Sequence, residues 1–143
     1  MSTKPRLQLA LDQTRLDTAL RTAETLSPHV DIIEAGTILC ISAGIQAVSA
    51  LRERCPQHTL VADLKVADAG ATLAEQAFGQ GADWMTVICA APLATMASAR
   101  EVAERHGGEK PTAPLRRRAM EGARQRASLL NTRCRRQTNL VEV

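Results

Sequence analysis

The sequence predicts an α/β fold built on a parallel sheet. Short apolar runs of strand length alternate with segments in which apolar residues recur at helical spacing. This alternation occurs four times between residues 7 and 108, and successive β-α units form parallel sheets with right-handed crossovers. Both a doubly wound sheet and a (β/α)8 barrel fit this order. A barrel usually needs about 200 residues or more, so a chain of 143 residues has room for about half of one.

The expected elements follow one another along the chain with clear stop signals. The strands are expected at residues 7–11, 30–33, 59–65 and 84–89. The helices are expected at residues 16–26, around residues 45–51, around residues 73–78, and at residues 92–106. Pro28 and Pro56 lie just beyond the first two helices, and Gly107-Gly108 ends the fourth. Aromatic residues make up only 1% of the chain, so the core is expected to be aliphatic.

The charge of the chain changes sign near Gly107-Gly108, and we predict a domain boundary there. Residues 1–108 hold nine basic and twelve acidic residues, whereas residues 109–143 hold nine basic and three acidic. The second segment is rich in arginine and opens with prolines, which are poor strand formers. We expect residues 1–108 to form the α/β domain and residues 109–143 to be a basic tail, disordered or weakly helical over 115–130.

Composition limits the cellular compartment and the binding partners that are expected for the chain. No apolar run approaches the length of about 18 residues that a membrane-spanning helix needs, and the first residues lack the apolar centre of a secretory signal. Four cysteines without a CxxC pair indicate free thiols and a cytoplasmic protein. Clustered arginines in the tail can bind nucleic-acid phosphates, but the tail has no aromatics for base stacking, so nucleic acid is not the expected partner.

Charged side chains gather where the predicted strands end. They are Asp12, Glu34, Asp63, Lys65 and, in the turn after the third strand, Asp68. The carboxyl ends of parallel strands form the functional face of such folds. Asp63 and Lys65 lie two residues apart and so point to one side of their strand. Strands lie about 4.8 Å apart, so Glu34 and Asp63 can converge on one cation, and two carboxylates with waters suit Mg²⁺.

Each of these charges also has a simpler interpretation as a solvated strand end or a helix cap. Asp12 precedes the first predicted helix and could cap it. A cap does not explain five charges at three successive strand ends. If Lys65 is buried among the carboxylates, it stays charged and can stabilise a developing anion.

Three segments carry a family resemblance. Asp63-Leu64-Lys65-Val66-Ala67-Asp68-Ala69-Gly70 resembles the D-x-K-x-x-D motif of the orotidine 5'-monophosphate decarboxylase suprafamily. The segments IEAGTILC, at residues 33–40, and WMTVICAA, at residues 84–91, resemble the 3-keto-L-gulonate-6-phosphate decarboxylases in particular. The resemblance runs from about Leu7 to Gly108, and the combination of the three segments is far more specific than D-x-K-x-x-D alone.

The resemblance implies a fold, a reaction and a set of roles. The fold would be the N-terminal half of a (β/α)8 TIM barrel, and the reaction a Mg²⁺-dependent loss of CO₂ from 3-keto-L-gulonate 6-phosphate that yields L-xylulose 5-phosphate. It implies that Glu34 and Asp63 bind Mg²⁺, and that the metal and Lys65 stabilise an enediolate. It implies further that Asp12 contacts the substrate or orients Lys65. Asp68 would reach across a dimer interface into the partner's site, so a homodimer is implied.

The segment after Gly108 departs from the family. The family continues with a fifth strand that bears a substrate-contacting Glu, then a His and an Arg near the reacting carbon, and late loops that bind phosphate. None of that pattern follows Gly108, so the chain is expected to be truncated, with a non-homologous tail. Alternatives to the decarboxylase stay open: a 3-hexulose-6-phosphate synthase, which joins formaldehyde to a sugar phosphate, and an inactive fragment or a nucleic-acid binder that acts through its basic tail.

Overall fold

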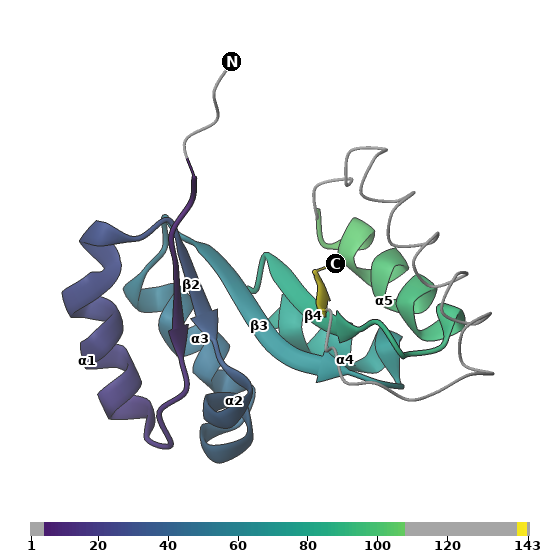
Figure 1. Ribbon diagram of the computed structural model, residues 1–143, viewed down its shortest axis with the longest axis horizontal. Helices are drawn as coiled ribbons and strands as arrows, with labels where there is room; N and C mark the ends of the chain where they lie inside the picture. The colour runs from purple at the N-terminus through teal and green to yellow at the C-terminus, as the bar shows by residue number, and fades with distance from the viewer. Residues whose placement is uncertain (1–4, 108–139, 143) are drawn as a thin grey trace, which may run out of the picture.

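A five-stranded sheet organises the protein, whose computed structural model describes residues 5–107 and 140–142. The strands lie in the order β1-β2-β3-β4-β5, and the first four run parallel (Figure 1). Their bounds are β1 Gln8–Leu11, β2 Ile32–Ala35, β3 Thr59–Val66, β4 Trp84–Ile88 and β5 Leu140–Glu142. The four strands expected from the sequence are therefore confirmed, with ends that differ by one or two residues.

The helices follow the strands in alternation. Their bounds are α1 Leu16–Leu26, the 3₁₀ helix η1 Ser27–His29, α2 Thr37–Ala43, α3 Gln46–Arg54, α4 Gly70–Gly79 and α5 Leu93–Arg105. All four expected helices are present. The short helix α2 was not expected, because its seven residues are too few to show a helical period.

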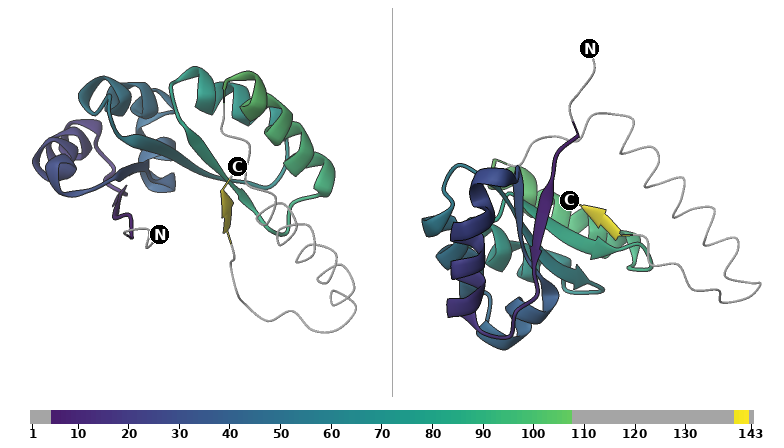
Figure 2. Two further views of the ribbon diagram at one scale, coloured as in Figure 1. Left: turned by 90° about the horizontal axis from the view of Figure 1, so that it is seen from above. Right: turned by 60° about the vertical axis from the view of Figure 1, so that its left-hand side comes forward.

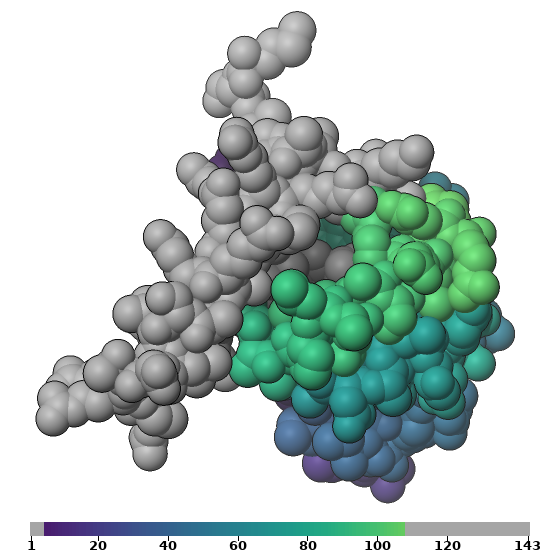
Figure 3. Space-filling view, turned by 90° about the vertical axis from the view of Figure 1, so that its right-hand side faces the viewer, coloured from purple at the N-terminus to yellow at the C-terminus, as the bar shows by residue number. Residues whose placement is uncertain are grey.

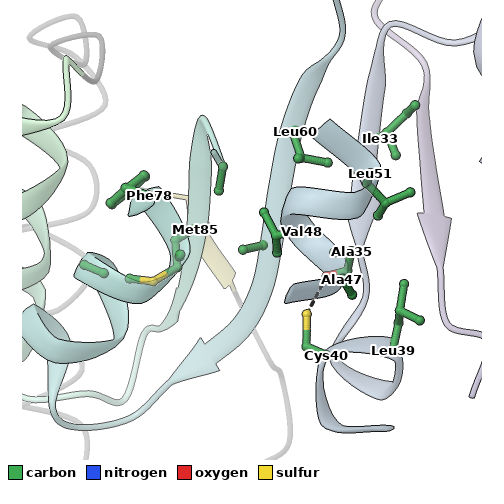
Figure 4. Close-up of a cluster of buried hydrophobic side chains, with 14 of the residues drawn as sticks. Ile33, Ala35, Leu39, Cys40, Ala47, Val48, Leu51, Leu60, Phe78 and Met85 are labelled. Atoms are coloured by element: carbon green, nitrogen blue, oxygen red, sulfur yellow. Dashed lines mark hydrogen bonds between the residues drawn. The ribbon is translucent and has the colours of Figure 1, made fainter. Parts of the chain in front are cut away.

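All the α-helices contribute to one apolar core on one face of the sheet. Alternate residues of the strands, such as Ile33, Leu60 and Met85, join residues of α1 to α5 in this core (Figure 4). Seen from above, the helices lie along one side of the sheet (Figure 2). Doubly wound sheets carry helices on both faces and reverse their strand order. The sequential order and one-sided cover seen here are instead those of a (β/α)8 barrel.

Close contacts at both ends of the pair hold helix α5 against helix α4. Gly70, the first residue of α4, has no room for a side chain, because an added Cβ would overlap the carbonyl oxygen of Thr95 in α5. At the other end of the pair, Glu75 of α4 accepts hydrogen bonds from Arg105 and His106. Helix α5 lies at the outer surface of the molecule, where Figure 3 shows it in green.

The pairing of β3 with β4 contains an irregularity that affects the site. Ala62 pairs with Met85 and Val66 pairs with Val87, so three residues of β3 lie opposite the single residue Thr86 of β4. Such a bulge bends a strand and redirects its side chains. Lys65, inside the bulge, has a backbone φ of 47°, in the left-handed region that residues other than glycine rarely occupy.

The segment expected to be a basic tail is described only at its end. Leu140–Glu142 form β5, which pairs antiparallel with β4, so the expectation of a disordered or weakly helical tail is wrong for these residues. The helix expected over 115–130 lies outside the described residues, and the boundary near residue 108 stays a prediction. Cys40, Cys55 and Cys89 are free thiols, while Cys134 lies outside the described residues. Within the described ranges, the structure contains no helix long and apolar enough to cross a membrane.

Candidate active site

The candidate site lies on the face of the sheet opposite the helices, at the carboxyl ends of the strands. Glu34 of β2 is in register with Val61 of β3, and Asp63 lies two residues further along β3. Side chains alternate along a strand, so Glu34 and Asp63 share a face. Their immediate neighbours Ala35 and Ala62 belong to the apolar core on the other face. The predicted convergence of Glu34 and Asp63 follows from this register.

The Asp63 carboxylate is the most buried charged group of the site. Its side chain is only 7% exposed. Thr86 donates a hydrogen bond of 2.6 Å to Oδ1, and the hydroxyl of Thr37 lies 2.9 Å from Oδ2. The ammonium of Lys65 also contacts Oδ2 in an ion pair. Both carboxylate oxygens are therefore held by donors from three different elements, α2, β3 and β4.

Lys65 is paired with Asp63 and remains accessible. Its ammonium lies 2.6 Å from the Thr37 hydroxyl as well as on Asp63, yet its side chain is 43% exposed. The expectation that Lys65 is buried among carboxylates is wrong, because Lys65 lies in the bulge of β3 and 43% of its side chain is exposed. The exposed ammonium can meet a ligand that approaches from solvent.

The pKa values of the two carboxyl groups move in opposite directions. Burial raises the pKa of Glu34, the hydrogen bond that it accepts from Gln8 opposes this rise, and the nearby charge of Asp63 adds to it. Burial also acts to raise the pKa of Asp63, but hydrogen bonds from Lys65, Thr86 and Thr37 outweigh it and lower that pKa. Two carboxylates whose environments separate their protonation are typical of functional sites.

Cys40 of α2 lies behind the acidic cluster. Its thiol is buried and contacts the carbonyl oxygen of Ala35 at 3.5 Å, the dashed line in Figure 4. Burial raises its pKa to about 11, and the negative charges of Asp63, Asp12 and Glu34 act in the same direction. The thiol is therefore neutral, and part of the rise in its pKa comes from the negative charge of three carboxylates.

Asp12 belongs to this edge but makes a different contact from the one expected. Helix α1 has no side-chain cap, so the interpretation of Asp12 as its cap is wrong. The Asp12 Oδ1 atom instead lies 3.4 Å from the backbone nitrogen of Ile38, in the first turn of α2. Gly36 permits this approach, because a Cβ there would overlap the Asp12 carboxylate. Among the described residues, no hydrogen bond joins Asp12 to Lys65.

Asp68 lies apart from the cluster. It is exposed in the turn between β3 and α4, and within the part of the chain that the structure describes it makes no ion pair or side-chain hydrogen bond. The structure thus brings together Glu34, Asp63 and Lys65, places Asp12 beside them, and leaves Asp68 facing solvent. An exposed Asp68 is compatible with a contact to a second chain, which stays a prediction.

Three polar residues at the centre of the site were missed as participants. Gln8, Thr37 and Thr86 hold the carboxylates of Glu34 and Asp63 through side-chain hydrogen bonds. Thr37 and Thr86 lie inside two of the three segments that carry the family resemblance, but their spacing gave no signal of a role. Gln8 lies on β1 two residues before Ala10, the residue that pairs with Glu34, and so shares the face of the sheet that carries the site. Its polar side chain on that face was the only signal in the sequence.

The donor set suits a hard divalent cation with a partly open coordination sphere. Within residues 5–107 and 140–142, no three side chains of the His, Cys, Asp or Glu type converge on one point. A pair of carboxylates matches Mg²⁺, which usually keeps several waters and takes its other ligands from substrate. The raised pKa of Glu34 fits the same conclusion, because a divalent cation would offset the like charge of Asp63.

Fold and site together define a parallel α/β protein with a carboxylate pair and a lysine at the carboxyl ends of its strands. Comparison with known families agrees with this class. Residues 5–132 match the Orotidine 5'-phosphate decarboxylase / HUMPS family, and the chain belongs to it. The resemblance seen in the sequence is confirmed. The match extends past residue 108 into the segment predicted to be a separate tail.

Individual relatives show which members of the family this chain resembles. The chain is 60% identical over 106 residues to 3-keto-L-gulonate-6-phosphate decarboxylase SgbH of Escherichia coli K12, an alignment that covers 74% of this chain and 48% of that protein. A crystal structure of 3-keto-L-gulonate-6-phosphate decarboxylase from Vibrio cholerae superposes with a TM-score of 0.73 at 50% identity, covering 75% of this chain and 50% of that one.

A relative of the rival class is also similar. The structure of 3-hexulose-6-phosphate synthase from Salmonella typhimurium gives a TM-score of 0.73 at 32% identity and covers 83% of this chain and 60% of that one. Its identity is well below that of the decarboxylases. The chain spans about half the length of the curated relatives that it matches.

Proposed function

We propose that this chain forms the N-terminal half of a (β/α)8 barrel and catalyses the Mg²⁺-dependent decarboxylation of 3-keto-L-gulonate 6-phosphate. The observation that carries the proposal is the convergence of Glu34, Asp63 and the accessible ammonium of Lys65 at the carboxyl edge of the sheet. The identity of 60% to a named decarboxylase supports this substrate over that of the synthase.

Glu34 and Asp63 would hold the metal ion. Their carboxylates belong to neighbouring strands, and the charge of Asp63 disfavours ionisation of Glu34. When bound, Mg²⁺ would supply positive charge next to the oxygens on which negative charge develops. The hydrogen bonds from Thr37 and Thr86 keep Asp63 ionised and correctly oriented for this task.

Lys65 would stabilise the charge left by CO₂. When the bond to the carboxylate breaks, its electron pair stays on the substrate as an enediolate, and one proton taken up at that carbon gives L-xylulose 5-phosphate. A fixed ammonium beside the developing charge lowers the barrier, because it needs no reorganisation during the reaction. Asp63 and Thr37 fix that ammonium while 43% of the Lys65 side chain stays exposed to a substrate.

The two remaining acidic residues would act at the margins of the site. Asp12, exposed at the end of β1, would contact the substrate. Asp68, exposed after β3, would project into the site of a second chain, so the working form would be a homodimer. The sugar phosphate would be the small-molecule partner, and neither nucleic acid nor membrane is required.

CO₂ release from 3-keto-L-gulonate 6-phosphate by the purified chain tests the proposal. The matched pair of variants is Asp63→Asn, inside the cluster, and Asp17→Asn, exposed on α1 and paired with Arg15 and Arg21. Wild type and Asp17→Asn should release CO₂, and Asp63→Asn or treatment with EDTA should stop it. A folded wild-type chain that releases none contradicts the proposal. Condensation of formaldehyde with a pentulose phosphate in its place would favour the synthase.

A further inference from the structure

The single hydroxyl of Thr86 connects the side chain of Asp63 to the backbone of Lys65, both in β3. Its side chain is buried, with a relative exposure of 4% for the residue. The Thr86 Oγ1 atom donates to Asp63 Oδ1 at 2.6 Å and accepts from the backbone N–H of Lys65 at 2.9 Å. A hydroxyl has one proton and two lone pairs, so both bonds can exist at once.

The bulge in β3 explains why this hydroxyl is needed. Between the pairs Ala62–Met85 and Val66–Val87, the backbone of β3 leaves the regular ladder. The Lys65 N–H therefore bonds to a side chain of β4 instead of a backbone carbonyl. An N–H shielded from water without an acceptor is costly, and this one is partly buried; the left-handed conformation of Lys65, with φ at 47°, adds strain. The hydroxyl offsets the first of these costs directly.

The same hydroxyl also sets the orientation of the carboxylate. Asp63 receives its other donors, Thr37 and Lys65, on Oδ2, so Thr86 is the side chain that holds Oδ1. A carboxylate gripped at both oxygens by different elements cannot rotate about its Cβ–Cγ bond without breaking one of them. Mutation of a residue that orients a metal ligand typically weakens metal binding about ten- to a hundredfold.

We infer that Thr86 is a positioning residue that holds the Lys65 backbone and the Asp63 carboxylate in their working geometry. The inference rests on the proposed function and goes beyond it. Thr86 acts on the site through Asp63 and Lys65 and does not itself contact substrate or metal. Its action passes through the bulge: the hydroxyl keeps the bulge closed, and the bulge keeps the ammonium of Lys65 on Asp63 while exposing it.

The deciding comparison is between Thr86→Val and Thr86→Ser. Valine keeps the shape of threonine and loses the hydroxyl, whereas serine keeps the hydroxyl. In Thr86→Val, the hydrogen exchange of the Lys65 amide should speed up about ten- to a hundredfold, the effect of losing one buried hydrogen bond. Its Mg²⁺ dissociation constant, measured by calorimetry, should rise about ten- to a hundredfold. Thr86→Ser should restore both values to within about threefold of wild type.

A threonine at the amino end of β3 provides the control. Thr59 of β3 accepts a hydrogen bond of 2.6 Å from Arg6, far from the cluster. Thr59→Val should leave the Lys65 exchange rate and the Mg²⁺ affinity unchanged. If Thr86→Val does not fold, Thr86→Cys makes the same comparison, because a thiol is a much weaker donor and acceptor.

The outcomes separate this inference from the proposed function. Unchanged Lys65 exchange and unchanged Mg²⁺ affinity in a folded Thr86→Val variant would overturn the role of Thr86, whether or not the wild type releases CO₂. Absence of CO₂ release from the wild type, with the Thr86→Val effects as expected, would overturn the proposed function and leave the role of Thr86 intact. If the wild type binds no Mg²⁺, the exchange rate of the Lys65 amide decides alone.

Discussion

Arg52 of α3 tests which contacts stabilise the sheet at the amino ends of its strands, opposite the site. Its guanidinium donates to the carbonyl oxygens of Gly81 and His58, both at 2.9 Å, and to that of Pro56 at 3.3 Å. It also pairs with Asp83 at 2.5 Å. One side chain thus ties α3 to the loops that enter β3 and β4. Contacts at the amino ends of the strands of such folds serve stability rather than catalysis.

Replacing Arg52 with alanine should cost about 3 kcal/mol in the free energy of unfolding. The two bonds of 2.9 Å contribute about 1 kcal/mol each, a typical net value for an intramolecular hydrogen bond. The ion pair contributes about 1 kcal/mol at most, because the Asp83 side chain is 49% exposed. The Arg52 side chain itself is only 25% exposed, so its aliphatic stem also loses contacts.

Urea unfolding followed by circular dichroism measures this loss, with Arg54→Ala as the matched control. Arg54 lies on the same helix and pairs with Glu24, but both side chains are about half exposed, at 51% and 45%. Its removal should cost less than about 1 kcal/mol. Arg52→Ala should leave the Mg²⁺ affinity unchanged. Equal urea midpoints for the two variants would refute the argument that burial and geometry, not charge, decide the contribution.

Three further predictions concern other parts of the molecule. The pKa of Cys40, about 11, leaves about one thiol in a thousand ionised at pH 8, so iodoacetamide should alkylate it far more slowly in the native than in the denatured protein, as mass spectrometry will show; equal rates would contradict its burial. The raised pKa of Glu34 means that folding disfavours its ionised form, and stability is lost as pH rises through that pKa; Glu34→Gln should raise the urea midpoint at pH 7, and a lower midpoint would contradict this. Deleting residues 140–143 removes β5 and exposes the edge of β4, so light scattering should detect association that the intact chain lacks, and a deletion variant that stays as dispersed as the intact chain would contradict it.

The regular elements were predictable because each shows its own period. Helix α1 runs over Leu16–Leu26, as the spacing of its leucines and alanines predicts. Helix α2 was not predictable in the same way. At its start, Gly36 lets the chain pass close to Asp12, whose carboxylate lies near the N–H of Ile38 in the first turn. That contact joins residues 26 apart in sequence, and no local pattern reveals it.

Strand β5 was out of reach for a related reason. Its residues pair with Thr86 to Ile88 of β4 in the antiparallel direction, although the rest of the sheet is parallel. Four β-α units give no indication of which distant segment will cover the last strand. Pairing of this kind depends on the free edge of β4 and on the length of the intervening chain, not on the composition of three residues.

Some features of the site were likewise predictable from the sequence, and others depend on contacts between distant segments. Glu34, Asp63 and Lys65 could be placed together from the period of strands and the adjacency of parallel neighbours. The exposure of Lys65 could not, because it depends on the bulge opposite Thr86. The roles of Gln8, Thr37 and Thr86 as hydrogen-bond partners likewise depend on register across three strands and on the position of α2.

Paramagnetic line broadening in the NMR spectrum tests the central claim most directly, with Mn²⁺ as a probe in place of Mg²⁺. The account predicts that substoichiometric Mn²⁺ broadens the amide signals around Glu34, Asp63 and Lys65 first, that Mg²⁺ reverses the effect, and that the signals around Arg52 at the opposite edge stay sharp. Broadening centred on another surface, or equal broadening in Asp63→Asn, would contradict the assignment of the metal site and the decarboxylase function built on it.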